Sequence, residues 1–199
     1  MASVIVGDPS VFALESSITQ PYERLSQRAL GFFVIHVAGA CYGVRSSDAT
    51  LLACSFDAVQ RRIAQRGKHC VRFDSGMPAA KIVQAFRTAW YDEPCQDKLV
   101  LGMACKDIVD TFVFGEIVWA PDGDEAFDDG SHVLQFDIGD RVRLIAFKDT
   151  DGQEDVVRTL SEVSIDADAF YRVLDKWQSG FESEWTSALK LAMEKKAAT

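Results

Sequence analysis

The stretch HVLQFDIGDRVRLIAFKDTDGQ, residues 132–153, carries the pattern that decides the fold. Apolar and polar residues alternate on both sides of Gly139 and Asp140, which is typical of strands with one buried face. Glycine beside aspartate favours the tight turn that joins two antiparallel strands. The stretch therefore predicts a β-hairpin whose apolar side chains face a core.

Further strands are predicted on both sides of this hairpin, because β-branched and apolar residues cluster between turn residues. Residues 3–18 predict two strands separated by a Gly-Asp-Pro turn, and residues 29–45 predict a hairpin that turns near Gly39. Shorter elements are predicted as strands at residues 99–103, 114–123 and 156–165 and as one helical turn at residues 105–112.

Helical periodicity is predicted in the middle and at the end of the chain, over residues 55–67, 77–94 and 167–197. Ser55 and Asp166 stand where N-caps are expected, and Gly180 is expected to bend the last helix. The predicted fold class is α+β, a mainly antiparallel sheet with two mid-chain helices and a long C-terminal helix. A single domain over residues 1–199 is expected.

The composition is that of a globular protein, with 199 residues of which 48% are hydrophobic and 26% charged. No apolar run approaches the roughly 18 residues that a membrane span requires, and the start MASVIVGDPS lacks the features of a signal peptide. We therefore expect a cytoplasmic protein without a membrane partner. The five cysteines form no C-x-x-C pair and are expected to be reduced thiols.

The net charge of −9 is unevenly distributed along the chain. Residues 22–90 contain ten basic and four acidic residues, whereas residues 121–155 contain eleven acidic and three basic ones. The second segment is therefore expected to form an electrostatic face, which would attract basic proteins and repel nucleic acid. No direct nucleic-acid partner is predicted. The alternative is that these charges only solvate turns.

The stretch PDGDEAFDDGSH, residues 121–132, concentrates this acidity in a predicted loop between two strands. Its candidate binding carboxylates are Asp122, Asp124, Glu125, Asp128 and Asp129. The start of the stretch resembles a calcium-binding EF-hand loop, but Phe127 stands where that loop needs glycine and Val133 where it needs glutamate. No metal or other cofactor is therefore predicted.

Phe127 is the one bulky apolar residue of this acidic stretch. An aromatic ring among carboxylates suits a protein-binding loop, since the charges steer a partner and the ring makes the desolvated contact. The alternative is that Phe127 folds back and holds the loop against its own domain. A second candidate surface, for an acidic partner, is predicted at Arg61, Arg62 and Arg66.

Three blocks of sequence carry a resemblance to a known family: VIVGDPSVFALESSIT at residues 4–19, GFFVIHVAG at 31–39 and FYRVLDKW at 170–177. Together they resemble the immunity protein 42 family of bacterial polymorphic toxin systems, which is similar in role to the immunity proteins of contact-dependent growth inhibition. The resemblance implies a cytosolic antidote that binds the C-terminal domain of a cognate toxin delivered by a neighbouring cell. Such toxins are often nucleases.

The predicted function is therefore neutralisation of a toxin, either a tRNA- or a DNA-cleaving one, by a charged surface that occludes it. A nuclease cleft must bind phosphate, so an acidic protein face can occupy it. None of the common local catalytic motifs occurs and the three histidines are scattered, so no catalytic residue is assigned. Two alternatives stay open: a small metal-dependent enzyme using the carboxylates of residues 122–140, and an adaptor for a protein other than a toxin.

Overall fold

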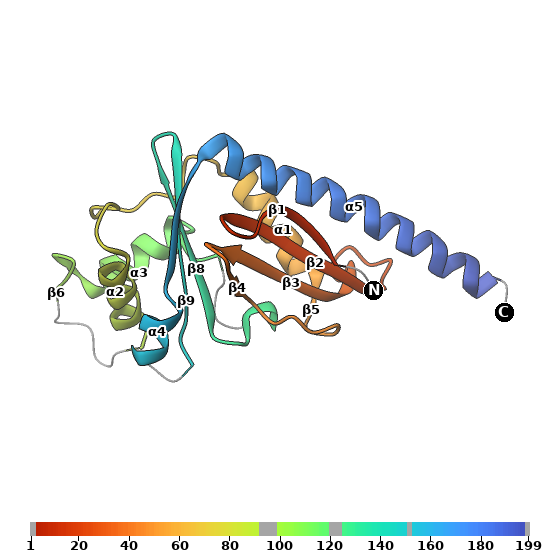
Figure 1. Cartoon of the computed structure of the whole chain (residues 1–199), viewed down its shortest axis with the longest axis horizontal. Coiled ribbons are helices and arrows are strands. Elements are labelled where there is room, and N and C mark those ends of the chain that lie inside the picture. Colours follow the sequence, from red (N-terminus) through yellow and green to blue (C-terminus); the bar gives the residue numbers. More distant parts are fainter. Residues whose placement is uncertain (1–2, 92–98, 120–124, 151–152, 198–199) are drawn as a thin grey trace.

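The computed structural model describes residues 3–91, 99–119, 125–150 and 153–197, and it confirms the α+β class with antiparallel sheets and a long C-terminal helix (Figure 1). A five-stranded sheet comprises β1 (Val4–Asp8), β2 (Phe12–Pro21), β3 (Ala29–Val37), β4 (Ala40–Tyr42) and β5 (Thr50–Leu51). A three-stranded sheet comprises β8 (Ser131–Ile138), β9 (Arg141–Lys148) and β10 (Ser161–Asp166). A small two-stranded sheet comprises β6 (Leu99–Val100) and β7 (Met103–Ala104).

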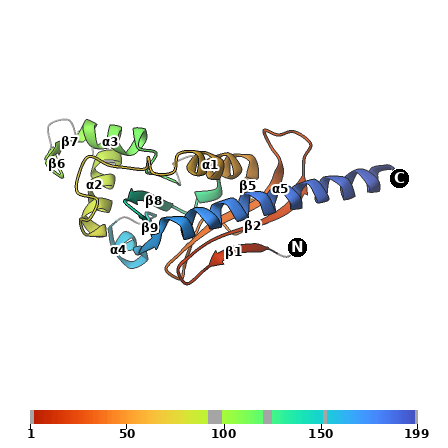
Figure 2. The ribbon, with the colours of Figure 1, turned by 90° about the horizontal axis from the view of Figure 1, so that it is seen from above.

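Helices cover these sheets from several sides. They are α1 (Leu52–Ala64), α2 (Ala79–Tyr91), α3 (Cys105–Phe114), α4 (Gln153–Thr159), α5 (Ala167–Ala197) and the short 3-10 helix η1 (Glu125–Phe127). Figure 2 shows α1 and α5 on the same side of the five-stranded sheet, with α2 and α3 at the far end of the molecule from the C-terminus. Within the described residues no helix is long and apolar enough to cross a membrane.

The predicted hairpin is confirmed as β8 and β9, whose register runs from Ser131 opposite Lys148 to Ile138 opposite Arg141. Its burial differs from the expectation of one buried face, because both faces of these strands are covered. Val133 packs in a first core and its neighbour Leu134 in a second one. The three-stranded sheet is therefore a wall shared by two cores, and this arrangement places polar residues of β8 in the interior.

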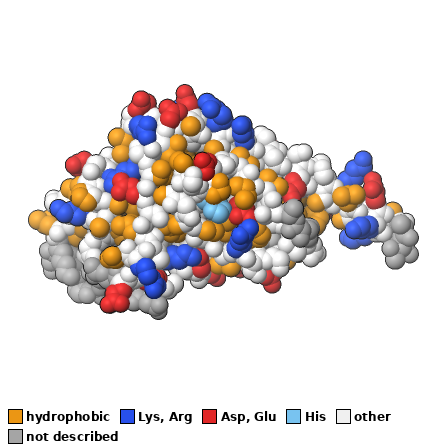
Figure 3. Space-filling model, in the orientation of Figure 1, with side chains coloured by type: hydrophobic (Ala, Val, Ile, Leu, Met, Phe, Trp, Pro, Cys, Tyr) orange, Lys and Arg blue, Asp and Glu red, His pale blue; other side chains and the backbone are white. Residues whose placement is uncertain are grey.

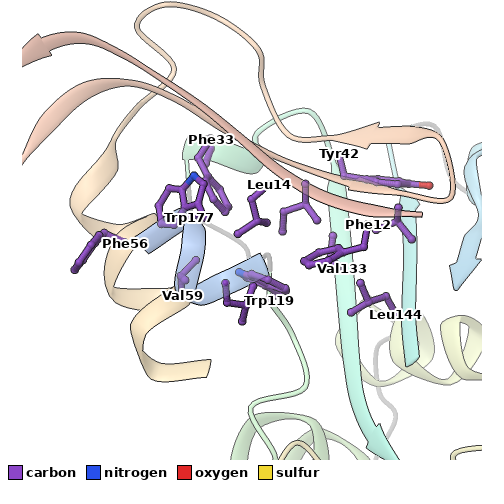
Figure 4. Packing of buried hydrophobic residues seen from close by; sticks show 14 of the residues in the cluster. Phe12, Leu14, Phe33, Tyr42, Phe56, Val59, Trp119, Val133, Leu144 and Trp177 are labelled. Carbon is purple, nitrogen blue, oxygen red and sulfur yellow. The ribbon is translucent and has the colours of Figure 1, made fainter. Parts of the chain in front are cut away.

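The first core lies between the five-stranded sheet and the helices α1 and α5. Figure 4 shows Phe33 of β3 and Trp177 of α5 in contact, and their ring centroids are 5.0 Å apart. Trp119, from the segment before β8, enters the same core beside Val59 of α1. The second core lies on the opposite face of β8 and β9, where Phe86 of α2 and other residues of α2 and α3 cover it.

Several element boundaries differ from the predictions. Helix α1 begins at Leu52, its N-cap Leu51 makes no side-chain capping bond, and Ser55 is buried inside the helix. Helix α3 spans ten residues instead of one turn. In the described part of the predicted strand 114–123, the only pairing is an isolated bridge between Val118 and Leu134.

The segment predicted as one strand over residues 156–165 divides into α4 and β10. Asp155 stabilises the helical half, since its carboxylate accepts a hydrogen bond from the hydroxyl of Thr150 (2.5 Å) and forms an ion pair with Arg158 (2.6 Å). Helix α5 continues through Gly180 without a break, and Asp166 caps it as predicted, with 2.9 Å between its Oδ1 and the amide nitrogen of Ala169.

The expectation of five reduced cysteines is wrong for Cys105, which is disulfide-bonded. Cys41 and Cys70 are free thiols.

Candidate functional site

The described part of the acidic stretch begins with η1, and its aromatic residue points inward. Phe127 is 6% exposed and packs edge-to-face on Phe33, with 6.3 Å between the ring centroids. The backbone carbonyl of Ala126 accepts a hydrogen bond from the amide of Val44 at 2.8 Å, which ties the turn to the chain after β4. Phe127 is therefore not an exposed anchor for a partner. Its ring folds back and holds the loop against its own domain, as the alternative prediction had it.

The carboxylates of the acidic stretch have different surroundings. Glu125 and Asp128 are exposed, whereas Asp129 is partly buried, forms an ion pair with Lys148 and accepts a hydrogen bond from the amide of Ser131 at 3.2 Å. Asp122 and Asp124 lie outside the described residues. Two of the predicted carboxylates thus remain directed to solvent in the part of the stretch that the structure describes.

The three arginines of the second candidate surface do not form one surface. Arg61 is exposed on α1 and Arg66 forms an ion pair with Asp168 at the start of α5. Arg62 is only 4% exposed, because its position on α1 faces the interior between the helix and β8. The prediction of a joint basic surface is therefore wrong for Arg62.

Arg62 belongs to a buried polar network at the junction of α1, α5 and β8. Its Nη1 atom donates hydrogen bonds to Oε1 of Gln135 at 3.0 Å and to the carbonyl of Glu116 at 3.1 Å. The amide of Gln135 in turn donates to Tyr171 and Asp137, and the Tyr171 hydroxyl donates to Asp137 at 3.0 Å. The network thus pairs most of the polar groups that the shared sheet places between the two cores, whereas Nε of Arg62 and Nε2 of His69 have no hydrogen-bond partner among the described residues.

Burial dominates the ionisation of this network. It lowers the pKa of Arg62 to about 9, although the charge of Glu116 acts in the opposite direction. Burial also raises the pKa of Tyr171, and the nearby carboxylate of Asp137 adds to that effect. Burial alone would raise the pKa of Asp137, but hydrogen bonds from His69, Gln135 and Tyr171 hold it below its ordinary value. The ionised carboxylate is therefore the form that the fold stabilises.

A groove of about 810 Å³ opens between the two cores and is bordered by the acidic turn. Its walls are largely aromatic and aliphatic, and the side chains that form them include Leu51, Phe86, Trp90, Phe112, Val113 and Trp119. Its charged lining residues are Asp57, Arg61, Arg62, Glu116 and Glu125. Because Arg62 is buried in the wall, the charges that reach solvent are three carboxylates and one guanidinium group.

Glu116 stands at this groove with an unusual backbone. Helix α3 ends in a Schellman motif, in which the amide of Ile117 bonds to the carbonyl of Phe112 and the amide of Glu116 to the carbonyl of Val113, both at 3.0 Å. The residue after the C-cap Gly115 adopts a left-handed conformation, normally that of glycine, and here Glu116 has φ of 46°. Its carboxylate accepts a hydrogen bond from Nε2 of Gln65 at 2.9 Å.

The opposite side of the molecule has a different charge pattern. Figure 3 shows the face over the five-stranded sheet, where acidic and basic side chains are interspersed among apolar ones. This view shows no field of a single sign, so the acidic turn and the groove beside it are the better candidates for a charged binding surface.

Several carboxylates that the metal-dependent alternative would use are engaged within the protein. No group of three or more His, Cys, Asp or Glu side chains among them could hold a metal ion. Within the predicted carboxylate segment, Asp137 is engaged in the buried network and Asp129 in an ion pair. His132 is buried and stacks on Phe147, with ring centroids 5.0 Å apart.

Sequence reasoning missed most of the groove. Trp90 and Trp119 both pack in cores, yet both also line the groove. Asp57 and Glu116 are isolated acids in the sequence, and only the packing of α1 against the end of α3 brings them to one opening. The left-handed conformation of Glu116 leaves no sequence signal, because the residue is not glycine or asparagine.

Comparison with known proteins identifies a family. The fold is similar to that in the crystal structure of CdiI from Burkholderia dolosa AUO158, with a TM-score of 0.55 and 16% sequence identity over 89% of this chain and 99% of that one. No curated protein matches the chain. The family model for immunity protein 42 matches residues 4–180, and so confirms the predicted resemblance. The chain belongs to the immunity protein 42 family.

Proposed function

We propose that this protein neutralises a cognate toxin by binding the toxin's C-terminal domain in the cytoplasm of the cell that it protects. Membership of the immunity protein 42 family over residues 4–180 is the observation that carries this proposal. The similarity to CdiI from Burkholderia dolosa supports delivery of the toxin by contact-dependent growth inhibition. The protein acts as a binding partner without a cofactor, and no catalytic step is required of it.

The toxin is a nuclease that cleaves tRNA or DNA. Eleven acidic residues against three basic ones in residues 121–155 support this choice, because a nuclease surrounds its substrate phosphates with lysine and arginine. The exposed carboxylates Glu125 and Asp128 are available for such a cleft, with Asp122 and Asp124 close to them in the sequence. They would occlude the toxin as phosphate mimics.

Co-expression tests this function directly. The toxin domain encoded beside this gene is expressed alone, with this protein, and with an unrelated acidic protein of similar size. We expect growth only in the presence of this protein, and intact tRNA and chromosomal DNA in the rescued cells. Death of the cells with or without this protein would refute neutralisation. If cells that express the toxin alone die with both tRNA and chromosomal DNA intact, the proposal that the toxin is a nuclease would be refuted.

A further inference from the structure

We propose that the groove between the two cores receives a protruding segment of the toxin that carries a lysine or arginine beside an apolar residue. This inference rests on the proposed neutralisation and names the surface and the chemistry that perform it. The groove residues that carry it are the rim acids Asp57, Glu116 and Glu125 and an apolar wall in which Val113 is exposed and Leu51 and Trp90 are half-buried.

The rim favours a cation. Asp57 and Glu125 are exposed and Glu116 is half-buried, whereas Arg61 is the one lining base that reaches solvent among the described residues. The charge of Arg62 is already engaged, since its guanidinium carbon lies 4.7 Å from the centroid of Trp119 and its Nη1 atom has two acceptors. The opening therefore has a net negative rim, which complements a basic side chain.

The wall favours a segment with an apolar part. Phe86 and Trp90 are stacked, with 4.7 Å between their ring centroids, and Phe112 packs against both of them. The buried rings of Phe86 and Phe112 hold Trp90 in place, and Trp90 with the exposed Val113 offers the surface against which an apolar side chain makes the desolvated contact of an interface hot spot. An extended loop of a basic protein offers both a basic and an apolar side chain within a few residues.

The depth of the groove also favours a peptide. The indole Nε1–H of Trp119 and the Nε–H of Arg62 are buried without an acceptor among the described residues. Both side chains belong to the groove wall, and an unpaired buried donor is costly. A main-chain carbonyl of an inserted segment is an acceptor that would lower this cost.

Glu116 permits a sharp test because glycine is the residue that its backbone conformation prefers. Glu116→Gly removes the carboxylate and relieves the left-handed strain, so the helix end stays formed. The groove variant combines this change with Asp57→Asn and Glu125→Gln. Its matched control neutralises three acids of α5 outside the groove lining, by Asp175→Asn, Glu182→Gln and Glu194→Gln.

Binding kinetics with the purified toxin domain distinguish the groove variant from the α5 control. We expect the affinity of the groove variant to fall by about tenfold or more and that of the control to change by less than about threefold. As an independent measurement, Cys54 lines the groove and is exposed, and bound toxin should slow the alkylation of its thiol severalfold.

The inference is overturned if the groove variant binds like the parent, or if Cys54 is alkylated as fast in the complex as in the free protein. Equal losses in the groove variant and the α5 control would also overturn it, because net charge and not the groove would then decide binding. Failure of the parent itself to bind the toxin would refute the proposed function, which is a separate outcome.

Discussion

The Nη1 atom of Arg62 lies 3.0 Å from Oε1 of Gln135, so a residue of α1 is hydrogen-bonded to the middle of β8, a strand of the sheet shared by the two cores. Removing this side chain by Arg62→Ala leaves the carbonyl groups of Gln135 and Glu116 without their donor in the interior. We expect a loss of about 3 kcal/mol in the free energy of unfolding, measured by urea denaturation. The matched variant Arg61→Ala, on the exposed side of the same helix, should change it by less than about 0.5 kcal/mol. Similar losses in both variants would contradict the role of Arg62 in the interior.

Phe127→Ala distinguishes a core residue from an interface anchor. Because the ring is buried against Phe33, its truncation leaves a cavity, and we expect a loss of about 3 kcal/mol or more in the free energy of unfolding. The dissociation rate of the toxin complex, measured below the melting temperature of the variant, should change little. A variant of unchanged stability whose complex dissociates many times faster would show that the ring reaches the toxin instead.

The hairpin of β8 and β9 shows what local pattern can predict and where it fails. Alternating residues around Gly139 were sufficient for the strands and their turn, because these depend on neighbours in the chain. The burial of both faces was not predictable, since Val133 and Leu134 enter different cores only through the packing of distant helices. Arg62 was misjudged for the same reason, as its environment comes from β8 and not from its own helix.

The helix ends were less predictable than the helices. Asp166 caps α5 as expected, because an N-cap acts on the amides that directly follow it. Ser55 fails as a cap because α1 continues directly from β5, and the buried contacts of Leu52 extend the helix towards its N-terminus. The groove depends on tertiary packing throughout. Of its residues, Arg61, Arg62, Glu125 and His132 lay in segments that the sequence singled out, but nothing in the sequence indicated that they share one opening.

Asp137 should make the stability of the protein sensitive to acid. Its folded-state pKa is held below the ordinary value of about 3.9, so the stabilisation it provides is fully present above about pH 4 and is lost as the pH falls through the folded pKa. We expect Asp137→Asn to cost about 2 kcal/mol at pH 7 and clearly less at pH 3, measured by urea denaturation at both pH values. Asp140→Asn at the exposed hairpin turn is the control. An equal cost of Asp137→Asn at both pH values would contradict this account.

The acidic stretch should control how fast the toxin is captured. Attraction between opposite charges acts mainly on the encounter and weakens with salt, because the screening length is about 8 Å at physiological ionic strength. The charge-reversed variant combines Asp122→Lys, Asp124→Lys and Asp128→Lys. We expect it to associate severalfold more slowly, with a flatter salt dependence of the association rate and a smaller effect on the dissociation rate. Asp129 is left unchanged, since its ion pair with Lys148 supports the fold.

Both rates are measured by surface binding at two salt concentrations, with circular dichroism to verify folding. If the charge-reversed protein associates as fast as the parent at low salt, these carboxylates only solvate the turn, and the acidic rim of the groove is then the remaining electrostatic contact.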